Sequence, residues 1–167
     1  MNFLIRVLII KLYFVSNVLA DEISGIPKII DGDTIHIGSN KIRLEGIDAP
    51  EMRQKCKKEY FKIKILAGYT FYTDYYCGEV SKKKLLNKIK KSKIRCKISS
   101  QDRYKRYLAT CFKKRLNLNQ WMVRNGYAIV YRRYSKKYLL DEAFAKENKL
   151  GLWKGKFIRP EKWRKLN

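Results

Sequence analysis

The first half of the chain alternates apolar and polar residues in short runs. The runs "IPKII", "DTIHIG" and "KIRLEGI" are separated by Asp31-Gly32 and by Gly38-Ser39-Asn40, which are residues typical of turns between strands. Further along, "SKIRCKISS" and "RYLATCF" also have the composition of strands, with "QDRYK" as the turn between them. The pattern predicts a meander of three strands, followed later in the chain by a two-stranded hairpin.

Three later segments have helical patterns. Apolar residues recur near helical spacing in "GEVSKKKLLNKIKK", which is typical of an amphipathic helix. The segment "LNLNQWMVRNGYA" predicts a short helix that ends at Gly126, and "YLLDEAFAKENKLGLW" predicts a last one that ends at Gly151. Five strands with a helix between the third and the fourth predict an α+β fold that is mainly β, a five-stranded Greek-key barrel of the OB type with about three helices.

The N-terminal residues 1–20 look like an export signal. They combine an early Arg6, an apolar stretch and Val18-Leu19-Ala20, where a signal peptidase would cut. Lys11 interrupts the apolar stretch, and an uncleaved membrane anchor is the alternative, although such an anchor needs about 20 nearly uncharged residues. We therefore expect an exported protein, periplasmic or extracellular, with no stable membrane insertion after cleavage and with residues 21–167 as a single domain.

Residues 52–77 have no clear period and contain seven aromatic residues. We expect them to form a long loop, in which local structure can still form. The C-terminal segment "GKFIRPEKWRKLN" is expected to be either an extension that lies against the body or a loose basic arm.

The chain has four cysteines, an even number that in an exported protein suggests two disulfides. A hairpin centred on residues 103–104 places residues whose numbers sum to 207 opposite each other, and Cys96 and Cys111 satisfy this sum. Cys56 then pairs with Cys77 and ties the base of the 52–77 loop. A zinc site is the competing interpretation, but the sequence has no C-x-x-C motif and no Cys/His cluster.

The charge of the chain is strongly positive. It has 39 basic and 15 acidic residues, a formal net charge of +24, in a composition that is otherwise that of a globular protein. Such a charge favours a polyanionic partner, with nucleic acid as the leading candidate. Solvated lysine-rich faces and an acidic membrane surface are the alternatives.

Five of the 15 acidic residues nevertheless lie within the 21 positions from 31 to 51. They are Asp31, Asp33, Glu45, Asp48 and Glu51. Asp33 opens the second strand and Asp48 closes the third, so both can meet at one rim of a barrel, where they repel each other unless a cation lies between them. Oxygen ligands alone suit Ca²⁺. Asp31 we interpret as an ordinary Asp-Gly turn residue.

Arg43 lies on the third predicted strand, five residues before Asp48, and Glu51 follows Asp48 after Ala49-Pro50. Arginine forms two parallel charge-assisted hydrogen bonds to a phosphate, and a carboxylate that does not bind metal can position or deprotonate an attacking water. A metal, an arginine and a base together make a hydrolytic set.

Four motifs carry a family resemblance. They are "DGDT" (31–34), "IRLEGIDAPE" (42–51), "DRYKRYLA" (102–109) and "NGYAIVYRRYS" (125–135). In this order and spacing they resemble the staphylococcal nuclease-like family, the secreted thermonucleases, from about Ile29 to Trp153. The resemblance implies an endonuclease that acts on DNA and RNA and leaves 3′-phosphate ends. Single strands should be preferred, because stacking on tyrosines needs unpaired bases.

The resemblance also implies roles for single residues. Asp33 and Asp48 become calcium ligands, with the carbonyl of Ala49 as a third protein oxygen. Glu51 becomes the candidate general base, a role that is argued over in the family.

Arg43 and Arg106 become the two guanidinium groups on the scissile phosphate. Tyr104 and Tyr131 match tyrosines near the nucleotide site of the family, and the resemblance implies that they pack against base or phosphate. Lys105 stands where the family commonly has glycine, and a side chain there can alter the turn that aims Arg106.

Two questions stay open at this level. The 52–77 segment is longer than in the compact members. It either clamps single-stranded substrate through Tyr69, Phe71, Tyr72, Tyr75 or Tyr76 or is a packed, disulfide-tied surface loop, and we favour the second. The chain is expected to be an active nuclease and a monomer. The alternatives are a nuclease fold kept as a nucleic-acid-binding module and a cationic adhesion protein. The joint presence of Asp33, Arg43, Asp48, Glu51 and Arg106 argues against both of the latter.

Overall fold

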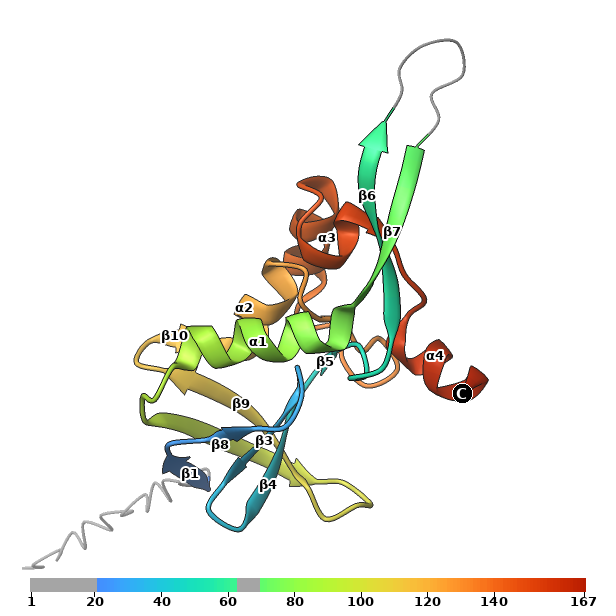
Figure 1. Ribbon diagram of the computed structural model, residues 1–167. Coiled ribbons are helices and arrows are strands. Elements are labelled where there is room, and N and C mark those ends of the chain that lie inside the picture. The colour runs from blue at the N-terminus through green and yellow to red at the C-terminus, as the bar shows by residue number, and fades with distance from the viewer. Residues whose placement is uncertain (1–20, 63–69) are drawn as a thin grey trace, which may run out of the picture.

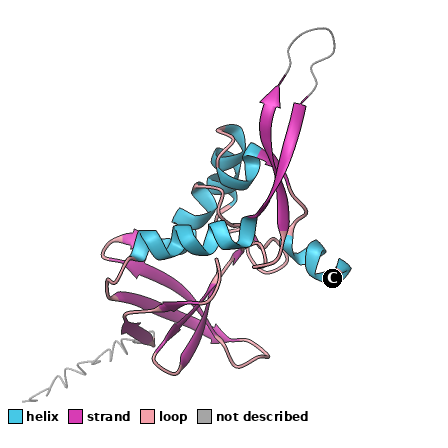
Figure 2. Cartoon of the chain, viewed as in Figure 1, coloured by secondary structure: helices cyan, strands magenta, loops and turns pink. Residues whose placement is uncertain are grey.

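The main sheet of the computed structural model, which describes residues 21–62 and 70–167, curls into a barrel (Figures 1 and 2). Its strands are β1 (Glu22–Gly25), β2 (Lys28–Ile29), β3 (Thr34–Ile37), β4 (Asn40–Leu44), β8 (Ile94–Gln101) and β9 (Tyr107–Lys113), with β10 (Leu116–Asn117) paired to β9. The order is β1-β8-β9-β4-β3-β2, and β4 and β9 run parallel.

The two edges of this sheet belong to one stretch of chain. Only Ile26 and Pro27 separate β1, which pairs with β8, from β2, which pairs with β3. Proline has no N–H to give to a strand ladder, so the chain leaves one edge there and joins the other. The prediction of a mainly β fold of the OB type is confirmed.

The β8–β9 hairpin has the predicted register. Cys96 lies opposite Cys111, and the two form a disulfide with a Cα–Cα distance of 4.0 Å. The pairing shifts by one residue between Ile98 and Ser100, nearer the turn.

Helices cover one side of the barrel. They are α1 (Cys77–Ile89), α2 (Leu118–Arg124) and α3 (Leu139–Glu147), followed by the short 3-10 helix η1 (Gly151–Lys154) and by α4 (Pro160–Leu166). The three predicted helices are present, although α3 ends four residues before Gly151, which instead has a positive φ and opens η1. Helix α4 was not predicted. Proline at its first position and basic residues in its last turn are ordinary helix signals that a segment of seven residues carries only weakly.

The core lies between the sheet and the helices. Strand β3 turns Ile35 and Ile37 inward and leaves His36 only partly buried, as alternation requires. Helix α1 contributes Leu85 and Ile89, both fully buried, and α2 contributes Met122. Each such buried side chain stabilises the fold by roughly 1.5–3 kcal/mol through burial alone.

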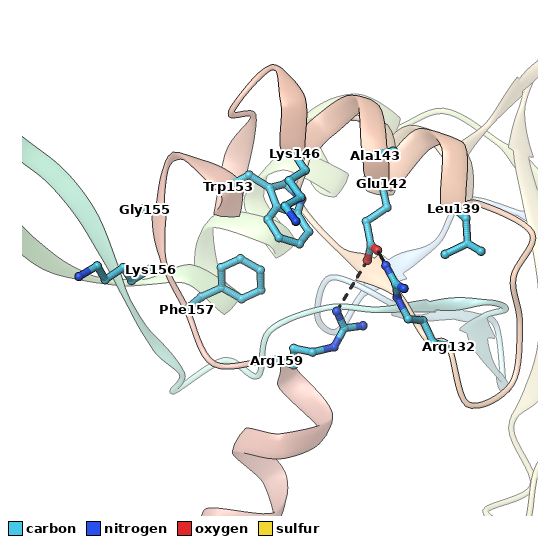
Figure 3. Close-up of a pocket in the computed structure, with 10 residues that line it drawn as sticks. All are labelled: Arg132, Leu139, Glu142, Ala143, Lys146, Trp153, Gly155, Lys156, Phe157 and Arg159. Atoms are coloured by element: carbon cyan, nitrogen blue, oxygen red, sulfur yellow. Dashed lines mark hydrogen bonds and ion pairs between the residues drawn. The ribbon is translucent and has the colours of Figure 1, made fainter.

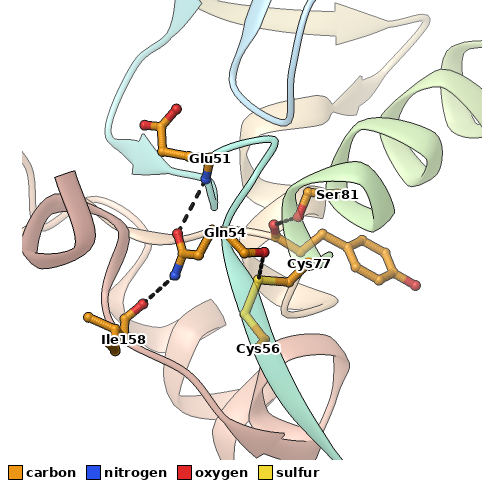
Figure 4. The surroundings of a disulfide bond; sticks show 7 residues. Glu51, Gln54, Cys56, Cys77, Ser81 and Ile158 are labelled. Carbon is orange, nitrogen blue, oxygen red and sulfur yellow. Dashed lines mark hydrogen bonds between the residues drawn. A yellow bond between two sulfur atoms is a disulfide. The ribbon is translucent and has the colours of Figure 1, made fainter. Parts of the chain in front are cut away.

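The prediction of a long loop over residues 52–77 is wrong. Strands β6 (Lys55–Lys62) and β7 (Thr70–Tyr76) form a hairpin that stands away from the barrel, and β12 (Gly155–Lys156) pairs with β6 on its other side. The predicted tie at its base is present, because Cys56 and Cys77 form a disulfide with a Cα–Cα distance of 5.7 Å (Figure 4). The sequence did not predict these strands because most of their described side chains are exposed, and an exposed strand has no alternation of apolar and polar residues.

A last pair of strands positions the site. Strands β5 (Ile47–Asp48) and β11 (Ile129–Val130) run antiparallel, with Asp48 opposite Ile129. Among the helices described, none is long and apolar enough to span a bilayer. The predicted signal at 1–20 and Tyr69, one of the aromatics considered for clamping substrate, lie outside the described residues.

Candidate active site

A cavity of about 690 Å³ opens at one rim of the barrel. Its walls come from the turn before β3, from β4 and the segment that follows it, from the β8–β9 turn, from the segment after β11 and from α4. Seven of the eight residues assigned from sequence line it: Asp33, Arg43, Ala49, Glu51, Tyr104, Arg106 and Tyr131. The eighth, Asp48, is fully buried and connects to the cavity through hydrogen bonds.

The turn before β3 is built around Asp31. Its Oδ1 accepts hydrogen bonds from the backbone N–H groups of Asp33, at 2.8 Å, and Thr34, at 2.7 Å. This is the ordinary turn role that the sequence suggested. Burial, and then the charge of Asp33, raise the pKa of the Asp31 carboxyl to about 6.

The carboxylates of Asp33 and Asp48 converge on Arg43, as the ends of neighbouring strands allow. Pairing of β3 with β4 places Arg43 opposite Thr34, next to Asp33. Arg43 donates from Nη1 to Asp33 Oδ1, at 2.5 Å, and from Nη2 to Asp48 Oδ1, at 3.1 Å. Asp33 Oδ2 also accepts from the N–H of Ala49 at 2.7 Å. Arg43, expected on the substrate phosphate, thus holds the two proposed metal ligands together.

The donor chemistry here fits a calcium ion. Burial, and then the charge of Asp33, raise the pKa of the Asp48 carboxyl, so an added positive charge would be stabilised. Asp48 Oδ2 is buried and has no hydrogen-bond partner among the described residues. No group of three or more His, Cys, Asp or Glu side chains in residues 21–62 and 70–167 is placed to hold a metal. The expected set of two carboxylates and a carbonyl does not need such a group.

The position of Glu51 is fixed through its backbone. Its N–H donates to Gln54 Oε1 at 3.3 Å, its carbonyl accepts from the N–H of Gln54 at 2.8 Å, and Gln54 Nε2 donates to the Ile158 carbonyl (Figure 4). Helix α1 starts directly against this segment, because a Cβ on Gly78 would lie 2.0 Å from the Glu51 carbonyl oxygen. The carboxylate itself points into the cavity region with 37% of the side chain exposed.

Sequence reasoning missed Arg164. This residue of α4 donates from Nη1 to Glu51 Oε1 at 2.7 Å and from Nη2 to Asp48 Oδ1 at 2.9 Å. Hydrogen bonds to the two carboxylates, together with their charges, outweigh burial and raise the pKa of Arg164. The only signal in the sequence was the run "RPEKWRK", whose helical start could have been noticed, but nothing in it points to this pair of carboxylates.

Arg106 is aimed by the β8–β9 turn. Asp102 Oδ1 accepts from the N–H groups of Tyr104 and Arg106, and Asp102 Oδ2 accepts from Arg106 Nε at 2.8 Å and Nη2 at 2.7 Å. Burial raises the pKa of the Asp102 carboxyl, but these hydrogen bonds and the charge of Arg106 outweigh it and lower the pKa overall. Lys105 has a φ of +58°, in the left-handed region that glycine adopts without strain.

The two tyrosines lie beside the arginines. The Tyr131 ring is 5.9 Å from the guanidinium carbon of Arg43, and the Tyr104 ring is 5.4 Å from that of Arg106. Tyr104 is 61% exposed, and the Arg103 guanidinium carbon lies 4.8 Å from its ring centre as well. Tyr131 also packs edge-on against Tyr134, a further tyrosine of the same cavity.

A second cavity, of about 610 Å³, lies between α3 and the C-terminal segment (Figure 3). Its acidic residue Glu142 accepts from the N–H of Val130 and pairs with Arg132 and Arg159. Arg159 also donates to the Val130 carbonyl at 3.0 Å and directly precedes α4. These bonds fix where α4 begins and so help to position Arg164.

Fold and site together define a nuclease of the OB-barrel class. A family model described as "Staphylococcal nuclease homologue" matches residues 41–155, and the chain belongs to that family. Helix α4 and Arg164 lie beyond the matched residues.

Several curated proteins are similar over most of the chain. The succinoglycan biosynthesis protein ExoI of Rhizobium meliloti is 33% identical over 138 residues, which are 81% of this chain and 66% of that protein. An uncharacterized endonuclease of Haemophilus influenzae is 32% identical over 146 residues, 83% of this chain and 70% of that protein. Protein MJ1439 of Methanocaldococcus jannaschii is 33% identical over 75% of this chain and 69% of its own length.

Proposed function

We propose that the chain is an exported, calcium-dependent, sugar-nonspecific endonuclease that hydrolyses phosphodiester bonds of DNA and RNA and leaves 3′-phosphate ends. The observation that carries the proposal is the shared cavity. Asp33, Arg43 and Glu51 lie in it together with Arg106, which comes from a turn more than fifty residues later in the chain. Asp48 is joined to them by its bonds to Arg43 and Arg164.

Asp33 and Asp48, with the Ala49 carbonyl, would hold the calcium ion. When bound, the ion supplies positive charge that stabilises the phosphoryl oxygens in the transition state. The free Oδ2 of Asp48 supports this assignment because a buried carboxylate oxygen without a partner is costly unless a cation or a donor meets it.

Arg43 and Arg106 neutralise the charge that builds on the phosphate. A guanidinium has five N–H donors, and the hydrogen bonds and ion pairs described above use two of them on each arginine. Each arginine can therefore keep its carboxylate partner and still donate to a phosphate oxygen. The carboxylates hold both guanidinium groups in place before the substrate arrives, which avoids reorganisation during the reaction.

Glu51 orients the attacking water and accepts its proton. The carboxylate is partly exposed and lies at the cavity wall, so a water molecule can reach it. In-line attack then places the departing oxygen on the far side of the phosphorus. The base of the nucleotide needs no specific contact for this chemistry, so we expect little sequence preference.

Preference for single strands is supported by the exposed Tyr104 ring at the cavity, since stacking on a tyrosine needs an unpaired base. Export is supported by the two disulfides, which persist in oxidising compartments. Nothing in the described residues requires more than one copy of the chain to complete the cavity.

The test is hydrolysis of single-stranded DNA and RNA by the 21–167 protein, with calcium or with a chelator, beside a Glu51→Gln variant. We expect calcium-dependent cleavage that falls by at least about a hundredfold in the variant. End-group analysis of the products distinguishes 3′-phosphate from 5′-phosphate. Salt-sensitive binding without cleavage at any calcium concentration would instead assign the chain to the nucleic-acid-binding modules.

A further inference from the structure

The β6–β7 hairpin and β12 form a three-stranded sheet with two different faces. One face packs on the body through Cys56, Cys77 and Tyr75, which join Ile129 and Leu152 in a small hydrophobic cluster. The opposite face contains every second residue of the same strands, and these residues point away from the cluster. It has no partner in the part of the chain that the structure describes, and we call it the hairpin face: Lys55, Lys57, Glu59, Tyr72, Asp74, Tyr76 and Lys156.

The hairpin face carries two tyrosines, three lysines and two acidic residues. Tyr72 is 36% exposed and Tyr76 46% exposed, and both lie on β7, four residues and therefore about 13 Å apart. The ammonium group of Lys156 lies 4.8 Å from the centre of the Tyr72 ring, and that of Lys55 lies 5.8 Å from the centre of the Tyr76 ring. Each ring thus has a cation beside it.

We propose that the hairpin face is a binding surface for single-stranded nucleic acid, an extension of the catalytic cavity. The proposal rests on the proposed function and names how that enzyme holds a polymeric substrate. An exposed tyrosine gives a surface on which an unpaired base can stack, and a neighbouring lysine neutralises the phosphate that follows. The net charge of +24 on the chain favours a polyanion over a neutral partner.

The hairpin face is also joined rigidly to the catalytic segment. Lys55 follows Glu51 by only four residues, so their Cα atoms lie at most about 14 Å apart. Gln54 binds the backbone of Glu51 on one side and the carbonyl of Ile158 on the other, and the Cys56–Cys77 disulfide follows at once (Figure 4). A strand of a few nucleotides can therefore reach from the cavity to Tyr76.

The test compares long and short substrates. In a Tyr72→Ala/Tyr76→Ala variant we expect the KM for a single-stranded DNA of about 20 nucleotides to rise about tenfold or more, because each stacked base contributes roughly 1–3 kcal/mol to binding. The kcat for this DNA, and the KM for a dinucleotide that fills the cavity alone, should stay unchanged. A Tyr72→Phe/Tyr76→Phe variant keeps the aromatic rings and should bind as the parent does.

Phe144→Ala is the matched control. Phe144 is 37% exposed and has the Arg124 guanidinium 3.8 Å from its ring centre, but it lies on α3 and is not part of the three-stranded sheet. Thermal melting of each variant establishes that the fold is retained. If the double alanine variant raises the KM for the dinucleotide as much as that for the long strand, or leaves the KM for the long strand unchanged, the proposal is overturned.

A binding measurement separates this inference from the proposed function. Fluorescence anisotropy with a labelled 20-nucleotide strand in chelator requires no catalysis, and we expect about tenfold weaker binding by the double alanine variant. If the parent protein cleaves nothing but the double alanine variant still binds the strand more weakly than the parent does, the nuclease proposal is refuted and the proposal for the hairpin face stands. If the double alanine variant binds anionic lipid vesicles more weakly than the parent but binds the DNA strand equally well, the hairpin face is assigned to a membrane surface and the proposal of nucleic-acid binding is refuted.

Discussion

Arg164 on the last helix donates to the carboxylate of Glu51 at 2.7 Å, across 113 positions of sequence. The same guanidinium also holds Asp48, one of the two carboxylates assigned to calcium. A residue outside the region matched by the family model therefore contacts both the proposed base and a proposed metal ligand. A cation arriving at Asp48 would meet a positive charge already in place.

Replacing Arg164 with alanine should therefore strengthen calcium binding. Removal of the guanidinium leaves Asp48 and Glu51 without the counter-charge that both now share. The two carboxylates then repel each other in a partly buried site, and a calcium ion relieves that repulsion. We expect the Kd for calcium to fall about tenfold, equal to about 1.4 kcal/mol, in isothermal titration calorimetry. Lys165→Ala removes the same charge from the same helix at an exposed position and serves as the control. Unchanged or weaker binding by the Arg164 variant would refute competition between the two cations.

Asp102 should be a positioning residue for Arg106. In Asp102→Asn the amide oxygen can still accept from the backbone of Tyr104 and Arg106, but the amide nitrogen cannot accept from the Arg106 guanidinium. We expect kcat to fall about tenfold to a hundredfold with an unchanged melting temperature, because small misplacements of a catalytic group have effects of this size. A fall in melting temperature that accounts for the lost activity would assign Asp102 to folding instead.

The pH dependence of this turn follows from the lowered pKa of Asp102. A group whose pKa is lower in the folded state stabilises the fold above its ordinary value and loses that contribution as the pH falls through the folded value. Between neutral pH and the ordinary carboxyl value of 3.8, the Asp102 contact should persist. If the parent loses activity between neutral pH and pH 3.8 while Asp102→Asn does not, the expected persistence of the Asp102 contact is contradicted.

Lys105→Gly should relieve strain in the same turn. A non-glycine residue in the left-handed region costs roughly 1–2 kcal/mol, and glycine costs roughly 0.5–1 kcal/mol through the entropy of the unfolded chain. With a φ of +58° at Lys105, we expect a net stabilisation of about 0.5 kcal/mol by urea denaturation, and activity equal to or above that of the parent. Lys114→Gly, at a φ of +55° away from the cavity, should stabilise by a similar amount without effect on activity. Destabilisation by Lys105→Gly would mean that the lysine side chain makes a contact that outweighs its strain.

Asn119 should be essential for the segment that leads to Asp48. Its side chain is fully buried, accepts from the N–H of Cys111 at 3.0 Å and donates to the carbonyls of Glu45 at 2.9 Å and Ala109 at 3.0 Å. Asn119→Asp turns a donor into an acceptor that faces two carbonyl oxygens, so we expect a loss of about 3 kcal/mol or more in unfolding free energy. Asn87→Asp, the same substitution at an exposed position of α1, is the control, and equal stability of the two variants would refute this role.

Much of the site could be predicted because its parts are local. The turn at Asp31 and Thr34, the strand that carries Arg43 and the turn at Asp102 are each set by residues within about five positions of one another. Antiparallel pairing of adjacent strands then brings Asp33 and Arg43 together with little further choice. The Cys96–Cys111 register followed from the position of one turn in the same way.

The residues that escaped prediction depend on contacts between distant segments. Arg164 reaches Asp48 across 116 positions, and its place depends on the bonds that Arg159 makes to Glu142 and Val130 before α4 begins. The strands of the β6–β7 hairpin could not be predicted because they are exposed and lack the alternation of apolar and polar residues that burial imposes.

Periodicity and turn chemistry act over a few residues, and they were enough to predict the barrel, the two disulfides and the carboxylates at one rim. The contacts of Arg164 with Glu51 and Asp48 became known only from the folded chain, as did the open sheet face on which Tyr72 and Tyr76 lie beside lysines. A short helix or an exposed strand gains most of its stability from the surface on which it packs, and a linear pattern of residues does not specify that surface.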